Sequence, residues 1–276
     1  MAVQSTPSIA EAPGTPVPAN PRRRALDSAL GIVGEILITA GVLLGLFVLW
    51  QLFYTDVQSG RTQAAALDEI AWAEPVRVPA AAGQAPDAEV GTPEQTDLIP
   101  EDLKVYSPDG APVLASPATA DTFATVHVPR WGYDYVKPIS EGVSRAAVLD
   151  ELGIGHYPKT AMPGAVGNFS IAGHRTTYGK PFTDIDQLQE GDAIVVQTES
   201  AWYVYRVTST AIVAPTFVAA IAPTPDKAGV PATVASITLT SCHPRYSAAQ
   251  RYIVHGELEY WAPTGHGYPS EIVENA

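Results

Sequence analysis

An apolar segment close to the N-terminus constrains this chain more than any other feature of its sequence. Residues 36–53 are almost continuously apolar and follow an arginine triplet at residues 22–24. These ~18 residues approach the roughly 20 that a helix needs to cross a bilayer. The apolar region of a secretory signal is usually only about 7–15 residues long. The sequence therefore predicts a retained transmembrane anchor over residues 25–54, with cleavage after the alanine triplet at residues 64–66 as the alternative.

The charges beside this segment predict its orientation. Positively charged residues favour the cytoplasmic side of a membrane, so the polar residues 1–24, with their arginine triplet, are expected to form a cytoplasmic tail. Trp50, Phe53 and Tyr54 would form an aromatic belt at the outer end of the helix. We expect a single-pass protein of the cell membrane, with a cytoplasmic N-terminus and an extracellular domain.

The composition changes twice after the anchor. Residues 55–119 are rich in Ala, Pro, Asp and Glu, with few aromatic residues and no sustained periodicity. Such a composition cannot bury enough apolar surface to fold alone, so we predict a disordered extracytoplasmic linker, with a short helix over residues 64–72. Residues 262–276 are predicted to form a loose C-terminal tail.

The intervening region, residues 120–261, has the pattern of a folded β domain. Short β-like runs separated by Gly and Pro clusters are expected at residues 125–128, 168–172, 193–198, 201–209, 234–241 and 252–260. Helical patterns are confined to residues 144–152 and 184–188. Many short strands with turn signals favour a closed barrel or a sandwich over a parallel α/β sheet. The sequence thus predicts a mostly β fold.

Charge and cysteine usage limit the function classes. The formal net charge of −13 argues against a nucleic-acid partner, since phosphate binding needs a basic face. Cys242 is the only cysteine, which is too few for an internal disulfide or a cysteine-based metal site. No cluster of His, Asp and Glu has the spacing of metal ligands. We therefore expect a domain held by its hydrophobic core, with no metal and no cofactor.

The surroundings of Cys242 favour a nucleophile. Residues 236–242 alternate in polarity, so that Thr238, Thr240 and Cys242 share the face opposite to the core. The strand should end before Pro244, because proline cannot donate to a strand ladder. This places the thiol at the rim of a sheet, where a substrate can reach it. The alternative is a small buried apolar residue, the commonest role of a free cysteine.

Six histidines compete to partner the thiol. His174 follows a strand-like run and precedes a loop that contains glycine, a position suited to proton transfer. We rank His174 first. Of the others, His156 is expected in a turn, and His127 and His255 inside strands. His266 is expected in the tail, and His243 on the opposite face of the strand from Cys242.

Arg251 begins the last predicted strand, soon after Cys242 in the sequence. A loop that returns between two paired strands would bring its guanidinium beside the thiol, where its fixed charge could stabilise a thiolate or an oxyanion. Arg175 and Arg245 are rivals for this role. Together the groups suit acyl transfer: a thiolate attacks an acyl carbon, an imidazolium protonates the leaving amine and an arginine holds the oxyanion.

Several ordered motifs resemble one known family. Residues 238–242 (TLTSC) resemble the Thr-Leu-X-Thr-Cys signature of sortases, the membrane-anchored cysteine transpeptidases of Gram-positive cell surfaces. Residues 167–175 (GNFSIAGHR) are similar to the sortase run that contains the histidine, and residues 188–192 (LQEGD) to the Leu-X-X-Gly-Asp that follows it. The segment 242–251 is most similar to class E, the housekeeping-type sortases of actinobacteria. The resemblance covers residues 120–261.

The resemblance implies a fold and site residues. It implies a closed eight-stranded sortase-type β-barrel with short helices and a groove at one end. It assigns the roles of nucleophile, acid/base, and oxyanion and substrate stabiliser to Cys242, His174 and Arg251, respectively. The candidates for substrate binding are Thr240, Ser241 and Tyr178. Ser241 stands where the family usually has threonine, which keeps the hydroxyl and removes a methyl group from the substrate site.

The resemblance also implies a reaction and its partners. The expected enzyme cleaves the Thr–Gly bond of a Leu-Ala-X-Thr-Gly or Leu-Pro-X-Thr-Gly sorting signal in secreted proteins. It would then join the threonine, through a thioacyl intermediate, to an amine of a peptidoglycan precursor. One alternative is a wall enzyme of the L,D-transpeptidase type, but residues 240–243 (TSCH) lack the glycine of its Ser-X-Gly-Cys-X-Arg pattern. The other is a non-catalytic, membrane-anchored β module.

Overall fold

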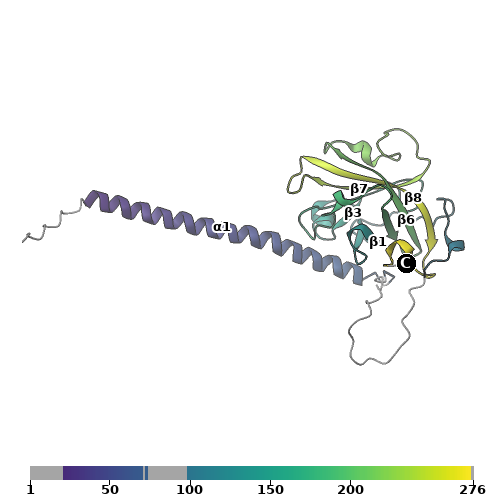
Figure 1. Cartoon of the computed structure of the whole chain (residues 1–276), viewed down its shortest axis with the longest axis horizontal. Helices are drawn as coiled ribbons and strands as arrows, with labels where there is room; N and C mark the ends of the chain where they lie inside the picture. Colours follow the sequence, from purple (N-terminus) through teal and green to yellow (C-terminus); the bar gives the residue numbers. More distant parts are fainter. Residues whose placement is uncertain (1–20, 71, 74–97, 275–276) are drawn as a thin grey trace, which may run out of the picture. The chain divides into compact units, whose positions relative to one another are not determined.

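The computed structural model describes residues 21–70, 72–73 and 98–274. It divides into two units, residues 1–51 and 52–276, which are considered separately (Figure 1). The first unit consists of the N-terminal part of helix α1 (Pro21–Asp68). Among the described residues, α1 is the helix that is long and apolar enough to cross a membrane.

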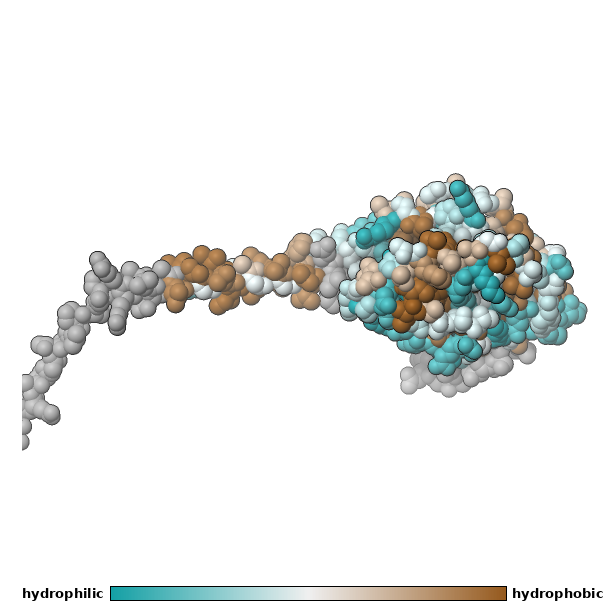
Figure 2. Space-filling model, turned by 90° about the horizontal axis from the view of Figure 1, so that it is seen from above, coloured by the Kyte–Doolittle hydropathy of each residue, from teal (hydrophilic) through white to brown (hydrophobic). Residues whose placement is uncertain are grey.

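The apolar part of α1 has the surface of a membrane-spanning helix. Large side chains such as Ile36, Leu43 and Phe47 are more than half exposed, and they form the apolar band seen along the helix in Figure 2. A helix that is apolar all round needs an apolar surrounding on every side. The predicted anchor over residues 25–54 lies within this helix, but α1 continues to Asp68.

The second unit contains a closed β-barrel. Its strands are β1 (Thr122–His127), β2 (Val136–Glu141), β3 (Ile154–His156), β4 (Gly167–Gly173), β5 (Ala193–Gln197), β6 (Ala201–Val213), β7 (Ala235–His243) and β8 (Gln250–Pro263). These eight strands of the described chain close in the order β1-β2-β3-β4-β7-β8-β6-β5. The β2–β3 and β4–β7 pairs are parallel, and the others are antiparallel. The predicted mostly β fold is confirmed as a barrel rather than a sandwich.

The six predicted strands match β1 and β4 to β8, whereas β2 and β3 were not predicted. Pro138 lies inside β2, and a proline normally argues against a strand because it removes a ladder donor. β3 has three residues, too few to show an alternation. The short helical turns are η1 (Glu101–Leu103), η2 (Pro129–Trp131), η3 (Arg145–Leu149), η4 (Ile185–Gln187), η5 (Val218–Ile221) and η6 (Ser270–Ile272). The predicted helical segments 144–152 and 184–188 thus form single turns, η3 and η4.

The described residues form two apolar clusters. Side chains that point into the barrel build the first, and those with no exposed surface include Val126, Phe169, Ile171, Ile194, Tyr205, Ile237 and Leu239. The second cluster lies around Val195, Trp202 and Tyr260, on the strands β5, β6 and β8. With no disulfide available, burial of this apolar surface must supply the main favourable term in folding.

Residues from the predicted linker and the predicted C-terminal tail cover the second cluster. Within the tail predicted over residues 262–276, Ile272 has no exposed surface and packs in that cluster. From the predicted linker, Ile99 is 4% exposed in the same cluster, and Val105 forms a β-bridge with Trp261. Residues 55–68 are helical. These described residues pack more closely than the sequence predicted, while residues 74–97 and 275–276 lie outside the described residues.

A buried histidine gives the fold a pH dependence. His127 is 1% exposed; its ring lies 5.5 Å from that of Trp202, and its Nε2 lies 3.2 Å from Thr125 Oγ1. Burial lowers the pKa of His127 from 6.5 to about 4, because a charged imidazole would lose its hydration. His255, also buried, has a pKa lowered by burial too.

We predict that acid destabilises the barrel between about pH 6.5 and 4. In this range the unfolded chain takes up a proton at His127 that the folded chain does not, so its contribution is complete above pH 6.5 and is lost as the pH falls. The loss approaches ~3 kcal/mol at pH 4. Thermal unfolding of the full chain at several pH values measures it. His127→Phe should flatten the dependence, whereas replacement of the exposed His266 by Gln should leave it unchanged.

Candidate active site

The three candidate catalytic residues lie on adjacent strands, at the same end of the barrel. β4 and β7 are parallel, with Ala172 opposite Thr240, and continuing this register by two residues places His174 beside Cys242. β7 and β8 are antiparallel and run side by side (Figure 1), with Cys242 directly opposite Arg251. Sequence analysis therefore selected residues that the sheet brings together.

Cys242 stands at the rim that the sequence predicted. β7 ends at His243, and the peptide bond from His243 to Pro244 is cis. Ile237 and Leu239 point into the barrel core, which confirms the predicted alternation. Cys242 is a free cysteine, and the residue is partly exposed rather than enclosed in the core. A thiol enclosed in the core, as in the alternative of a non-catalytic module, would be shielded.

His174 is oriented by a carboxylate that the sequence did not reveal. It follows β4 directly, and its Nε2 lies 2.6 Å from Oδ1 of Asp150, at the C-terminal end of η3. Its ring centroid lies 5.1 Å from that of Tyr178. A carboxylate on one ring nitrogen fixes the orientation of an imidazole and leaves the other nitrogen for proton transfer. Asp150 and His174 are joined by the β2–β3–β4 connections, and no local motif signals such a contact.

Arg251 is held by the loop that precedes it. Its Nη1 donates to the carbonyl oxygens of Ala248 at 3.1 Å and Gln250 at 3.0 Å. These bonds fix a positive charge on the strand next to the thiol, and such a charge favours a thiolate. The two rival arginines each pair with a carboxylate: Arg175 with Asp186 and Arg245 with Asp184.

The candidate substrate-binding hydroxyls join strands beneath the site. Ser241 Oγ donates to the carbonyl oxygen of Gly173 at 2.8 Å. Thr240 Oγ1 donates to the carbonyl oxygen of Ile171 at 3.3 Å and lies 3.0 Å from the hydroxyl of Tyr157. Both side chains are buried. They therefore stabilise the β4–β7 pairing next to the nucleophile.

His243 lies in a partly buried network at the end of β7. Nη1 of Arg175 donates to its Nδ1 at 2.9 Å. Because a guanidinium can only donate, Nδ1 accepts and Nε2 carries the proton of the neutral ring. Arg175 also lies over the ring of Tyr252, 5.8 Å from its centroid. This network connects the end of β4, the end of β7 and the start of β8.

The remaining histidines lie away from the end of β7 that contains Cys242, or make contacts inside the barrel. His156 was expected in a turn, but it ends β3, where Nδ1 lies 2.6 Å from Oε2 of Glu141. His255 lies inside β8 and contacts Thr238 Oγ1 at 2.8 Å. His266 is exposed in the C-terminal segment. Geometry therefore favours His174 among the candidates.

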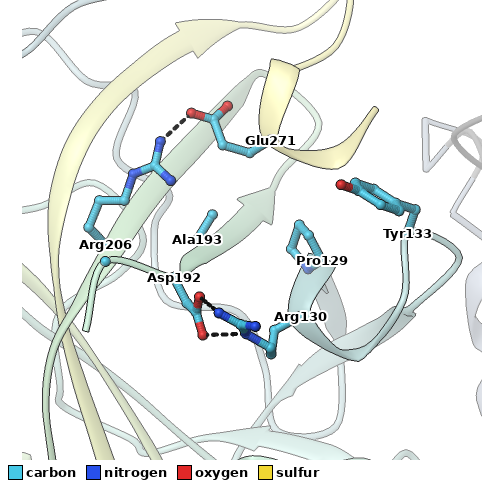
Figure 3. A pocket seen from close by; sticks show the side chains of 8 residues that line it. Pro129, Arg130, Tyr133, Asp192, Ala193, Arg206 and Glu271 are labelled. Atoms are coloured by element: carbon cyan, nitrogen blue, oxygen red, sulfur yellow. Dashed lines mark hydrogen bonds and ion pairs between the residues drawn. The ribbon is translucent and has the colours of Figure 1, made fainter. Parts of the chain in front are cut away.

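A separate shallow pocket lies elsewhere on the barrel. Its charged lining is internally paired: Arg130 bonds Asp192, and Arg206 bonds Glu271, as the dashed lines in Figure 3 show. None of the three candidate catalytic residues lines it. In the described part of the chain, no group of three or more His, Cys, Asp or Glu side chains is placed to hold a metal ion.

Comparison with known proteins identifies the family. A family model described as the sortase domain matches residues 126–259. Sortase SrtE2 of Streptomyces coelicolor is 32% identical over 249 residues, which are 85% of this chain and 84% of that protein. Sortase SrtE1 of the same organism is 35% identical over 249 residues, or 87% of this chain. The chain belongs to the sortase family.

The solved structures agree with this sortase assignment. The crystal structure of Sortase E1 from Streptomyces coelicolor with a tripeptide in the active site matches at 40% identity with a TM-score of 0.52, over 56% of this chain and all of that one. This confirms the predicted sortase-type barrel and the resemblance to class E. The chain spans 60% of the length of SrtE1.

The partial exposure of this sortase's single thiol leads to a prediction. Iodoacetamide should alkylate Cys242 in the native full-length chain within about tenfold of the rate in the unfolded chain. Mass spectrometry follows the single adduct, since no other cysteine is present. Alkylation that occurs only after unfolding would show a thiol closed to reactants.

Proposed function

We propose that this sortase is a transpeptidase that cleaves the Thr–Gly bond of a Leu-Ala-X-Thr-Gly or Leu-Pro-X-Thr-Gly sorting signal. It transfers the threonine to an amine of a peptidoglycan precursor. The observation that carries the proposal is that the three residues lie at one end of adjacent strands: His174 follows β4, Cys242 is the penultimate residue of β7, and Arg251 lies opposite Cys242 on β8. Family membership supplies the class of reaction.

In the first half of the reaction, the sulfur of Cys242 attacks the threonine carbonyl carbon. The carbonyl oxygen becomes an oxyanion, which the Arg251 guanidinium stabilises with its charge and its donors. As the tetrahedral species collapses, the C–N bond to glycine breaks and the imidazolium of His174 gives its proton to the leaving amine. A thioester on Cys242 and a free glycine amine result.

In the second half, the acceptor amine attacks the thioester carbonyl carbon. His174, now neutral, removes the proton from the attacking nitrogen, and Arg251 again stabilises the oxyanion. The C–S bond breaks, and its electron pair returns to the sulfur of Cys242. A new amide joins the threonine to the acceptor, and the thiolate and imidazolium are restored for the next cycle.

The N-terminal helix supports a membrane location for this reaction. We infer that α1 anchors the protein, with the arginine triplet at residues 22–24 in the cytoplasm and the barrel on the extracellular side. Secreted proteins with C-terminal sorting signals and lipid-linked wall precursors meet at this surface. A tethered enzyme encounters them at raised effective concentration.

The tripeptide in the active site of the Streptomyces coelicolor Sortase E1 structure supports a peptide substrate for this related barrel. In this chain, the partly exposed Cys242 gives an extended peptide access to the sulfur. Thr240 and Ser241 directly precede Cys242 on β7, and their hydroxyls bond the carbonyl oxygens of β4. We therefore assign these two residues, with Tyr178 beside His174, to the substrate site.

The nucleophile and the acid/base residue can be tested by transfer assays. The full-length chain in detergent, given a Leu-Ala-X-Thr-Gly peptide and triglycine, should form a threonine–triglycine product that mass spectrometry detects. Cys242→Ala should abolish it, and His174→Ala should lower the rate by at least about 10³-fold, because His174 gives a proton in the first step and accepts one in the second. His266→Ala, which alters an exposed histidine, should retain full activity. Near-normal transfer by the Cys242→Ala protein contradicts the proposal.

The oxyanion role of Arg251 can be tested against a neighbouring arginine. Arg251→Gln should lower kcat by about 10²-fold, the usual cost of removing an oxyanion donor. Arg245→Gln changes an exposed arginine of the same β7–β8 connection and should alter kcat less than about threefold. Steady-state transfer kinetics measure both. Equal effects of the two substitutions would argue against a specific role for Arg251.

A further inference from the structure

The last turns of α1 pack against the barrel and belong to the same unit. Ser59, Gln63 and Ala66 are each less than 9% exposed. Their spacing of four and three residues places them on one face of the helix. Gln63 is only 1% exposed, and such burial of a glutamine is uncommon unless its amide is used.

Gln63 bonds the loop that follows His174. Its Nε2 donates to the carbonyl oxygen of Tyr178 at 3.1 Å. A Cβ at Gly179 would lie 2.6 Å from this amide, and a Cβ at Gly153 would lie 2.7 Å from it. Both glycines have positive φ, +73° and +90°, so a side chain at either position would also strain the backbone. Two segments of the barrel thus leave room for one side chain of α1.

The loop is strained and needs restraint. Tyr178 has φ of +55° and Lys180 has φ of +37°, on either side of Gly179. Left-handed conformations cost about 1–2 kcal/mol for residues with a Cβ, and they persist only where the surroundings fix them. Asp56 of α1 supplies such restraint: it accepts from the N–H of Gly179 at 3.3 Å and pairs with Lys180 at 2.9 Å.

The same helix reaches His174 by a second route. Ser59 Oγ donates to the backbone carbonyl oxygen of Asp150 at 2.8 Å, and the Asp150 carboxylate bonds Nε2 of His174. On the other side, the Tyr178 ring packs against the imidazole. The imidazole therefore contacts two groups, Asp150 and Tyr178, and α1 binds the backbone of both.

We propose that Asp56, Ser59 and Gln63 of α1 form a brace that sets the position of the His174 imidazole for proton transfer, and that these three are positioning residues. This inference rests on the proposed acid/base role of His174. A displacement of about 1 Å in a catalytic group can cost up to ~10²-fold in rate. Loss of the brace should lower kcat with little effect on KM, since these residues act through His174 and not on the peptide.

The experiment compares two glutamines of one helix. In the full-length chain in detergent, Gln63→Ala should lower kcat for transfer about tenfold and change KM less than about twofold. Gln58→Ala is the matched control, because Gln58 is exposed and the same substitution leaves the loop untouched; its kcat should equal that of the unmodified chain. Assays run well below the unfolding temperature of each variant exclude loss of folded protein.

A second variant and a spectroscopic signal separate positioning from stability. Gln63→Glu keeps the length of the side chain but presents a carboxylate oxygen to the Tyr178 carbonyl, so its kcat should fall at least as far as that of Gln63→Ala. In histidine-labelled protein, the Cε1–H resonance of His174, assigned from its loss in His174→Ala, should shift in both Gln63 variants. It should not shift in Gln58→Ala.

The outcomes distinguish this inference from the proposed function. A lowered unfolding temperature in Gln63→Ala, with an unchanged kcat and an unchanged His174 resonance, would show that the contact is purely structural and overturn the brace. The acid/base proposal would then still stand. If His174→Ala itself retains transfer, the proposed role of the histidine fails, whatever the Gln63 variants do.

Discussion

The pairing of β7 with β4 on one side and β8 on the other determines where each reactive group lies. The parallel register with β4 brings Cys242 beside His174, which follows Gly173. The antiparallel register with β8 brings Cys242 opposite Arg251. A slip of one residue would turn the thiol towards the core and expose Leu239 instead. Burial of Leu239 and its neighbours in the barrel therefore fixes the register, and the register builds the site.

The barrel achieves its stability without a disulfide by using both faces of several strands. One face of β5 and β6 fills the interior, while Val195, Trp202 and Val204 on the other face form the second cluster. Ile99 and Ile272, from segments far apart in the sequence, cover this outer layer. The chain on either side of the barrel is thus part of its core, and the domain is larger than the matched sortase region, residues 126–259.

Local signals in the sequence predicted the strands with clear alternation and the trio of Cys242, His174 and Arg251. The features that the sequence did not predict depend on contacts between residues that lie far apart in the sequence. β2 was missed because it contains Pro138. The packing of the end of α1 was missed because its buried face contains the polar residues Ser59 and Gln63, which bond the barrel. Asp150 gave no signal either, because its contact with His174 exists only once the β2–β3–β4 connections fold.

One continuous helix, α1, contains both the apolar segment and the residues that bind the loop after His174, so under the proposed function anchoring and catalysis would share a structural element. The proposed function depends on acyl transfer through Cys242. It can be tested by intact-mass analysis of the full-length chain, mixed with a Leu-Ala-X-Thr-Gly peptide without an acceptor amine. We expect an adduct with the mass of the peptide up to threonine, mapped to Cys242 by digestion, and release of the glycine fragment. A folded chain with an alkylatable thiol that forms no adduct with this peptide or with its Leu-Pro-X-Thr-Gly counterpart would contradict it.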